Sequence, residues 1–160
     1  MRVGIGHDTH RLGQGGPLRL GGIDIPHDRH LVGHSDADVL LHAVTDALLG
    51  AAALGDIGEM FPDTDPANRG RDSADMLRLA HAAVEKAGHL IENLDCIVFA
   101  QRPKLSAHKD AIRGRLAEIL NLRPQQIGVK AKTGEGVGEV GREEVMMVQC
   151  VVLLKPMPRR

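Results

Sequence analysis

Large aromatic residues are almost missing from this chain: tryptophan and tyrosine do not occur, and phenylalanine stands only at Phe61 and Phe99. Proteins that bind single-stranded nucleic acid stack bases on aromatic rings, and nucleic-acid-binding domains in general carry a basic excess. Neither feature is present here, because 20 basic residues are balanced by 21 acidic ones and the formal net charge is -1. We therefore expect no nucleic-acid partner.

Long hydrophobic runs are also lacking. No segment approaches the roughly 20 apolar residues of a membrane-spanning helix, and the first residues, MRVGIGHDTH, lack the apolar stretch of a secretory signal. We expect no membrane partner and a cytoplasmic location, or an organellar one after removal of a transit peptide. Cysteine is scarce as well: Cys96 and Cys150 lie in apolar segments without a neighbour at metal-ligand spacing, and we expect both to be buried thiols.

The chain does contain enough apolar material for a core. The sequence is 42% hydrophobic over 160 residues, and a chain of that length buries roughly 70% of the surface that it exposes when unfolded. No internal repeat or low-complexity run divides it. We expect one domain over residues 1–160 that needs no disulfide or other cross-link to fold.

The spacing of apolar residues, together with glycine, proline and serine, predicts alternating strands and helices. Ser35 is the expected N-cap of the first helix, with Asp38 as a variant capping box and Gly55 after the helix end. The mixture predicts an α+β fold, with a mainly antiparallel sheet and helices packed on one face. The expected strands are 2–6, 18–25, 90–101, 126–133 and 143–154, the second with a hairpin or bulge at Gly21 and Gly22. The expected helices are one that follows Ser35, one over 73–87 and one over 106–120 with Ser106 as its cap. Residues 56–72 are expected to form a loop.

An aspartate and a histidine stand two residues apart in the first predicted strand, at Asp8 and His10, so their side chains share one face of it. Burial of either group without a partner is costly, so we expect a polar group or a metal to meet them. On the first helix Asp38, His42 and Asp46 are spaced four apart and share one stripe. Two histidines and one carboxylate form a ligand set for zinc or a similar divalent ion with an open fourth position.

Two roles are open for Asp46. One turn beyond His42, it could accept the proton of the imidazole's other nitrogen and fix the orientation of the ring. It is equally well explained as an ordinary exposed helix residue. His42 alone, without Asp8 and His10, would more often be a core or surface residue than a metal ligand.

Further polar residues surround the first helix. Its start offers free N–H groups and a positive dipole end to an anion, so His34 could donate to a phosphate oxygen there, or it could be a loop residue without a role. The following loop holds Asp56, Asp63 and Asp65, whose spacing does not match a known calcium loop. These acids could bind a hard cation or the hydroxyl groups of a sugar or polyol, or form a solvated turn.

Charged and glycine-rich segments, AQRPKL and KAKTGEGVGEVGR, each follow a predicted strand. Glycine lets the backbone wrap a ligand closely, but no glycine spacing of the usual ATP or dinucleotide type occurs. The alternative is a flexible hairpin loop with solvated charges. The residues as a whole predict metal-dependent handling of a small phosphorylated molecule. In these two segments, the residues that could contact the phosphorylated molecule are Lys104, Lys130, Lys132 and Arg142 as cations, Thr133 through its hydroxyl and Glu135 through its carboxylate.

Five segments carry a resemblance to a known family. In order and spacing, GHDTHR, LVGHSDADVLLHAVTDALLGAAALGDIG, FPDTDP, AQRPKL and VKAKTGEGVGEVGRE resemble the 2-C-methyl-D-erythritol 2,4-cyclodiphosphate synthases of the non-mevalonate isoprenoid pathway, over essentially the whole chain. The resemblance implies that 4-diphosphocytidyl-2-C-methyl-D-erythritol 2-phosphate is converted to the cyclic diphosphate and CMP by metal-assisted intramolecular phosphoryl transfer. This would make the protein a CMP-forming phosphorus–oxygen lyase.

The resemblance also implies a role for individual residues. Zinc ligands fall on Asp8, His10 and His42, and Glu135 would hold a second ion, Mg²⁺ or Mn²⁺, at the diphosphate. His34 and Thr133 match transition-state-stabilising, hence catalytic, positions. Substrate binding would fall on Asp8, Thr9, His10, His34 and Ser35; on Asp56, Ile57, Gly58, Phe61, Pro62, Asp63, Thr64 and Asp65 for the methylerythritol phosphate end; on Ala100, Gln101, Arg102, Pro103, Lys104, Leu105, Ser106, Ala131, Lys132, Thr133, Gly134 and Glu135 for the cytidine end; and on Arg142 toward the diphosphate or a trimer axis.

The assembly that the resemblance implies is a homotrimer with active sites between subunits, the cytidine pocket of one chain facing the metal site of the next. The last loop departs from some family members, because Lys132 and Glu139 stand where those carry threonine and phenylalanine. Lys132 could add a phosphate contact, whereas Glu139 would remove an apolar one.

Two other functions would use the same residues. One is a trimeric, metal-dependent ligand sensor that has lost catalysis, and the other is a metal phosphohydrolase that releases inorganic phosphate. The presence of all the expected site residues argues against the sensor, because a decayed site should lack at least one of them. Those residues are Asp8, His10, His42, Thr133 and Glu135.

Overall fold

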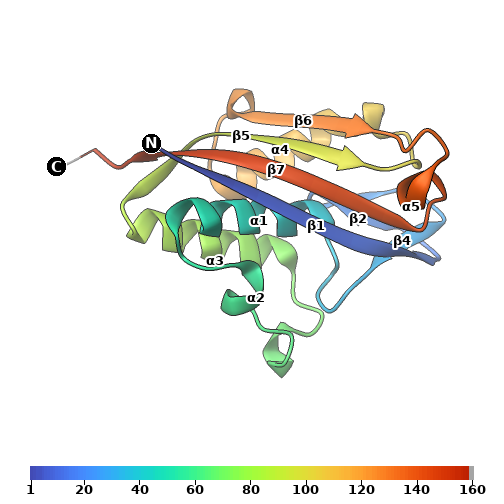
Figure 1. Ribbon diagram of the computed structural model, residues 1–160, viewed down its shortest axis with the longest axis horizontal. Helices are drawn as coiled ribbons and strands as arrows, with labels where there is room; N and C mark the ends of the chain where they lie inside the picture. The colour runs from blue at the N-terminus through green and yellow to red at the C-terminus, as the bar shows by residue number, and fades with distance from the viewer. Residues whose placement is uncertain (159–160) are drawn as a thin grey trace.

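The computed structural model describes residues 1–158 and has a five-stranded sheet with helices packed against it (Figure 1). The strand order is β4-β1-β7-β5-β6, with β5 and β6 parallel and the other neighbours antiparallel. The α+β expectation and its mainly antiparallel sheet are confirmed. The strands are β1 Arg2–Gln14, β2 Leu18–Leu20, β3 Ile23–Ile25, β4 Arg29–Val32, β5 His89–Phe99, β6 Ile127–Lys132 and β7 Val145–Pro156; the helices are α1 Val39–Ala52, α2 Ile57–Met60, η1 Pro66–Asn68, α3 Ser73–Lys86, η2 Leu105–Ala107, α4 Lys109–Leu120, η3 Pro124–Gln126 and α5 Gly138–Gly141.

One face of the sheet carries the core, because residues along each strand point alternately to the two faces. On β7, Val148, Cys150 and Val152 are fully buried toward the helices, and α1 contacts both β1 and β7. The opposite face is open in the single chain: Val3 and Ile5 on β1 are 67% and 66% exposed. Helices therefore pack on one face, as the sequence predicted.

The last two strands, β6 and β7, do not pair with each other as a hairpin. β6 follows α4 and pairs parallel with β5, as a helical crossover permits. The chain then returns through residues 133–144, and β7 inserts between β1 and β5. The glycine-rich segment is consequently not a hairpin loop, since β6 and β7 are not neighbours, and it contains the short helix α5.

Several element boundaries also differ. β1 extends to Gln14 rather than ending at residue 6, because its second half pairs with β7 and with β4, an unpredicted strand. Tertiary pairing here overrides the polar composition of the segment. Residues 56–72 contain α2 and η1, and Ser106 lies in η2 while α4 begins at Lys109. The expected hairpin at Gly21 and Gly22 joins β2 to β3.

The first helix begins later than expected, with Asp38 instead of Ser35 as its N-cap. The Asp38 carboxylate accepts hydrogen bonds from Leu40 N at 3.2 Å and Leu41 N at 3.1 Å. It also accepts from the hairpin, from Gly21 N at 2.9 Å and Gly22 N at 2.7 Å. Burial raises the pKa of Asp38, an effect that these backbone N–H groups oppose. This one carboxylate thus fastens the β2–β3 hairpin to the start of α1.

We expect Asp38→Asn to lower the free energy of unfolding by about 2 kcal/mol, because one acceptor oxygen becomes an amide donor that faces backbone N–H groups in a buried site. Denaturant unfolding followed by circular dichroism measures this change. Asp110→Asn, on the exposed side of α4 with 88% of its side chain accessible, is the matched control and should stay within about 0.5 kcal/mol of the wild type. Equal midpoints for the two variants would contradict the anchoring role.

The two cysteines face each other across β5 and β7, with Sγ atoms 3.1 Å apart and both side chains fully buried. The expectation of buried thiols is confirmed. Within residues 1–158, no helix combines the length and the apolarity that a membrane crossing requires.

Candidate functional site

Three potential metal ligands converge between β1 and α1. Asp8 Oδ2 lies 3.1 Å from His10 Nε2 and 3.0 Å from His42 Nδ1, and the two ring nitrogens are 3.0 Å apart. Asp8 and His10 lie on the helix-facing side of β1, and His42 is buried on the first half of α1. The face that Asp8 and His10 share, predicted from their spacing, therefore meets the histidine of the helix.

This triangle suits a divalent metal ion. A tetrahedral zinc with bonds of about 2.0 to 2.1 Å holds its ligand atoms about 3.3 Å apart, close to the observed separations. Burial acts to raise the pKa of Asp8, but hydrogen bonds and positive charge from His10 and His42 outweigh it and bring that pKa well below its usual value. The carboxylate is thus ready to act as an anionic ligand.

The fold brings α1 unusually close to β1 at the metal ligands. A Cβ added to Gly6 would lie 1.9 Å from the carbonyl oxygen of Ala43, and one added to Gly4 would lie 2.1 Å from that of Ala47. Only glycine permits such an approach of strand to helix backbone. Gly6 precedes Asp8 by two residues and Ala43 follows His42 directly, so this contact sets the distance between the two halves of the site.

The second nitrogen of His42 does not contact Asp46. His42 Nε2 lies 2.8 Å from Ser73 Oγ and 3.0 Å from Ser35 Oγ. Asp46 Oδ1 instead accepts a hydrogen bond from Ile57 N at 3.2 Å, and so holds the start of α2. Of the two roles left open for Asp46, the one as a partner of His42 is wrong. The spacing of four residues puts His42 and Asp46 on one side of α1, but the Asp46 carboxylate hydrogen-bonds the first residue of α2 instead of the imidazole.

The segments before and after α1 hold the other residues predicted around the metal group. His34 is exposed, and its carbonyl oxygen accepts from Gly70 N at 2.8 Å, which ties the loop before α1 to the loop before α3. Asp56 caps α2 and Asp65 caps η1, each by accepting a backbone N–H. Phe61 is buried, with the guanidinium carbon of Arg71 5.1 Å from its ring centroid.

The acids of that loop do not form a second cation site in the structure. Among the described residues, the one group of side chains close enough to hold a metal is Asp8, His10 and His42. The carboxylates of Asp56 and Asp65 are used as helix caps. Of the alternatives for Asp56, Asp63 and Asp65, contact with hydroxyl groups and a solvated turn therefore remain.

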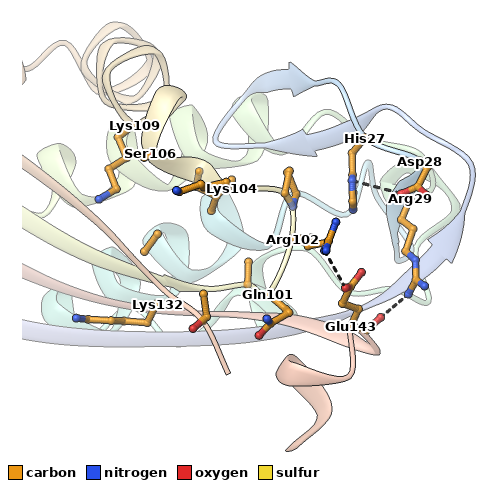
Figure 2. A pocket seen from close by; sticks show the side chains of 15 residues that line it. His27, Asp28, Arg29, Gln101, Arg102, Lys104, Ser106, Lys109, Lys132 and Glu143 are labelled. Carbon is orange, nitrogen blue, oxygen red and sulfur yellow. Dashed lines mark hydrogen bonds and ion pairs between the residues drawn. The ribbon is translucent and has the colours of Figure 1, made fainter. Parts of the chain in front are cut away.

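A separate cavity of about 860 Å³ opens where β5 and β6 end (Figure 2). Two predicted segments, residues 100–106 and 131–133, line it together, although they are distant in sequence. They meet because β5 and β6 are parallel neighbours, so the segments after them leave the same edge of the sheet. Lys104 and Lys132 supply positive charge at its walls, as does Lys109 from the start of α4.

Five residues of the cavity wall were not predicted: His27, Asp28, Arg29, Lys109 and Glu143. Arg102 Nε lies 3.5 Å from Glu143 Oε1, and Arg29 Nη1 donates to the carbonyl oxygen of Glu143 at 2.6 Å (Figure 2). The segment IPHDRH held a signal, since it combines charge with histidine near a proline, but nothing in the sequence shows that it lies beside residues 100–106.

Two residues that follow Thr133 are hydrogen-bonded to residues that line this cavity. Thr133 Oγ1 donates to Glu135 Oε1 at 3.0 Å, and Gly136 N donates to Gln101 Oε1 at 3.3 Å, which connects the two segments. Arg142 is exposed and pairs with Glu144 at 2.9 Å. Lys130 instead bonds Asp95 on the neighbouring strand and does not line the cavity.

The metal group and the cavity are separate within one chain. Among the described residues that line the cavity, none is Asp8, His10 or His42. The metal ligands lie between β1 and α1, whereas the cavity lies past the ends of β5 and β6 and is also lined by Arg29 at the start of β4. The two sites therefore have no residue in common.

Known proteins resemble this chain in sequence and in fold. A profile of the YgbB family matches residues 1–155. The 2-C-methyl-D-erythritol 2,4-cyclodiphosphate synthase of Gemmatimonas aurantiaca is 59% identical over 144 residues, which cover 90% of this chain and 87% of that relative.

Two solved structures have the same fold. The bifunctional IspDF from Campylobacter jejuni matches with a TM-score of 0.94 and 44% identity over 98% of this chain, which spans only 42% of that longer protein. A CDP-bound form of 2C-methyl-D-erythritol-2,4-cyclodiphosphate synthase matches with a TM-score of 0.89 and 42% identity, covering 96% of this chain and all of that one. This chain therefore belongs to the YgbB family, the family of the 2-C-methyl-D-erythritol 2,4-cyclodiphosphate synthases.

Proposed function

We propose that this chain converts 4-diphosphocytidyl-2-C-methyl-D-erythritol 2-phosphate into 2-C-methyl-D-erythritol 2,4-cyclodiphosphate and CMP, a step of non-mevalonate isoprenoid precursor biosynthesis. An oxygen of the 2-phosphate attacks the β-phosphorus of the same molecule. The bond from that phosphorus to the bridging oxygen breaks, and CMP leaves with this oxygen. Such a transfer needs positioned groups and charge neutralisation more than covalent chemistry from the protein.

Asp8, His10 and His42 would hold zinc at the β-phosphate. When bound, zinc withdraws electron density from phosphoryl oxygens and neutralises charge that develops on them. The convergence of one carboxylate oxygen and two ring nitrogens within 3.0 to 3.1 Å of one another is the observation that carries this proposal. Glu135 would hold the second ion, Mg²⁺ or Mn²⁺, at the diphosphate, and its exposed carboxylate beside Thr133 supports that role.

The cavity beyond β5 and β6 would bind the cytidine end. The related synthase was solved with CDP bound, and the cavity here combines an apolar wall, at Ala100 and Leu105, with lysines for phosphate groups. His34 and Thr133 would stabilise the charge of the transition state, and both side chains are exposed to an incoming ligand. The segment from Asp56 to Asp65 would contact the methylerythritol phosphate.

We further propose a homotrimer in which neighbouring chains complete each site. Two observations support it: the metal group and the cavity share no residue within one chain, and the open sheet face exposes Val3, Ile5 and Val151. Apolar residues of that kind on a sheet face are suited to burial against other copies. The one-domain organisation over residues 1–160 and a cytoplasmic location also belong to this proposal.

Product analysis tests the reaction. The purified protein is incubated with the proposed substrate, Zn²⁺ and Mg²⁺, and followed by ³¹P NMR. Two coupled signals of a ring diphosphate together with CMP are expected. Inorganic phosphate would identify a phosphohydrolase instead, and unchanged substrate would leave only a binding function; either result overturns the proposal.

Subunit complementation tests the shared site. His42→Ala lacks a metal ligand and Glu135→Ala lacks the second-ion ligand, so each variant alone should be inactive. If a site takes its metal group from one chain and its cavity from the next, co-expressed chains that mix randomly in cyclic trimers regain about one quarter of the wild-type activity. No recovery in trimers shown to be mixed would place each whole site within one chain.

A further inference from the structure

The ring of His42 is engaged on both of its nitrogens. Nδ1 belongs to the triangle with Asp8 and His10, and Nε2 lies 2.8 Å from the hydroxyl oxygen of Ser73. Ser73 is the first residue of α3, 31 positions from His42 in sequence, and is fully buried. Its hydroxyl therefore has no access to bulk water and must find its partners within the protein.

The single proton of that hydroxyl has a defined acceptor. Ser73 Oγ donates to Asp36 Oδ1. Asp36 also accepts from Ser73 N and from Asp38 N, each at 3.2 Å, and its Oδ2 lies 3.9 Å from Arg19 Nε. An ionised carboxylate has no proton to donate, so three donors and one cation hold Asp36 as an acceptor.

The tautomer of His42 follows from this count of protons. Because Ser73 uses its proton on Asp36, it can only accept at Nε2, and His42 must carry its own proton on that nitrogen. Nδ1 is then the nitrogen that gives up its proton when a metal binds, and its lone pair points to the side of Asp8 and His10, as a metal ligand needs. Ser35 Oγ, 3.0 Å from the same Nε2 and accepting from Ala37 N, is a second and less buried contact.

We propose that Asp36 and Ser73 are positioning residues for the metal centre, which fix the orientation and the tautomer of His42. The chain of contacts runs from carboxylate to hydroxyl to imidazole and couples the start of α3 to the ligand on α1. This inference rests on the metal site of the proposed function. It concerns residues to which the family resemblance gave no role.

Metal affinity without substrate tests the inference. Zinc binding is measured by competition with a chromophoric chelator, and cobalt loading is followed by its visible absorption. Removal of a partner that orients a metal-bound histidine typically weakens metal binding by about 10 to 100-fold. We expect a loss of this size for Ser73→Ala, with altered cobalt bands, and recovery in Ser73→Thr, which restores the hydroxyl.

The Asp36→Asn variant tests whether the loss of zinc affinity comes from the position of the hydroxyl proton or from changed side-chain packing. An amide NH₂ that faces Ser73 would donate to its oxygen, turn the serine proton toward His42 Nε2 and favour the wrong tautomer. This nearly isosteric variant should therefore also lose about 10 to 100-fold in zinc affinity. Thr45→Val is the matched control, since it removes a buried hydroxyl from α1 that donates to the Leu41 carbonyl oxygen. The zinc affinity of this control should stay within about 3-fold of the wild type, a much smaller loss than that expected for Ser73→Ala and Asp36→Asn.

The outcomes distinguish this inference from the metal site itself. Wild-type zinc affinity and cobalt bands in both Ser73→Ala and Asp36→Asn, with loss of zinc in His42→Ala, would overturn the positioning role and leave the site intact. Full zinc binding in His42→Ala would instead overturn the metal site. A loss in Thr45→Val equal to that in Ser73→Ala would assign the effect to packing and contradict the inference. Circular dichroism of each variant confirms that folded proteins are compared.

Discussion

The His42→Ala variant is expected to bind little zinc and to turn over substrate at least about 10³-fold more slowly than the wild type, because a bound metal contributes several kcal/mol of charge stabilisation to such a transfer. His42 supplies one corner of a triangle whose sides are 3.0 to 3.1 Å. Its removal leaves Asp8 and His10, and two ligands on a strand rarely retain zinc. Elemental analysis after dialysis and a CMP-release assay measure the two effects.

The matched control is His108→Ala, at the start of α4 and outside the metal group. It should keep its zinc and its activity, since it removes an imidazole of the same size from a different part of the chain. The fold of His42→Ala should persist, because the ring lies at the edge of the core and α1 keeps its apolar side chains. A zinc-free His42→Ala protein with normal turnover would contradict the proposed chemistry.

Gly6→Ala is the second variant with a large expected effect. The added methyl group would lie 1.9 Å from the Ala43 carbonyl oxygen, a backbone atom that cannot rotate away. Helix α1 would have to move off β1, and we expect a loss of about 3 kcal/mol or more in the free energy of unfolding. The same shift would separate His42 from Asp8, so zinc affinity should fall together with stability.

Gly114→Ala is the control for that substitution, because it adds the same methyl group where no atom lies within 4 Å, in the middle of α4. Alanine favours a helix over glycine by about 0.5 to 1 kcal/mol, so this variant should be slightly more stable than the wild type. Denaturant unfolding at equal protein concentration compares the two. A Gly6→Ala protein as stable as Gly114→Ala would show that the close contact does not hold the site together.

The metal group could be predicted from the sequence because its signals are local. A spacing of two on a strand puts Asp8 and His10 on one face, and together with that pair His42 on the helix completes a zinc ligand set. The partner of His42 Nε2 could not be predicted, since Ser73 follows a long loop and only the packing of α3 on α1 brings it near. The helix spacing pointed to Asp46 instead, a residue that the chain uses to hold α2.

The cavity was predictable in part for a similar reason. The segments after β5 and β6 carry charge and glycine, and they lie together once the two strands pair in parallel. His27, Asp28 and Arg29 line the cavity because of the way the β3–β4 connection folds. That connection has no periodic sequence pattern from which its path could be predicted. Likewise, Asp38 displaced Ser35 as the cap because its carboxylate also bonds the distant hairpin at Gly21 and Gly22.

A crystal of the zinc-loaded protein with CDP, measured on both sides of the zinc absorption edge, tests the central claim most directly. We predict one anomalous peak per chain, about 2.0 to 2.2 Å from Asp8 Oδ2, His10 Nε2 and His42 Nδ1, with the fourth position open toward a phosphoryl oxygen. A zinc peak bound by other residues, or no peak between β1 and α1 in fully loaded protein, would contradict the claim that these three side chains form the metal centre.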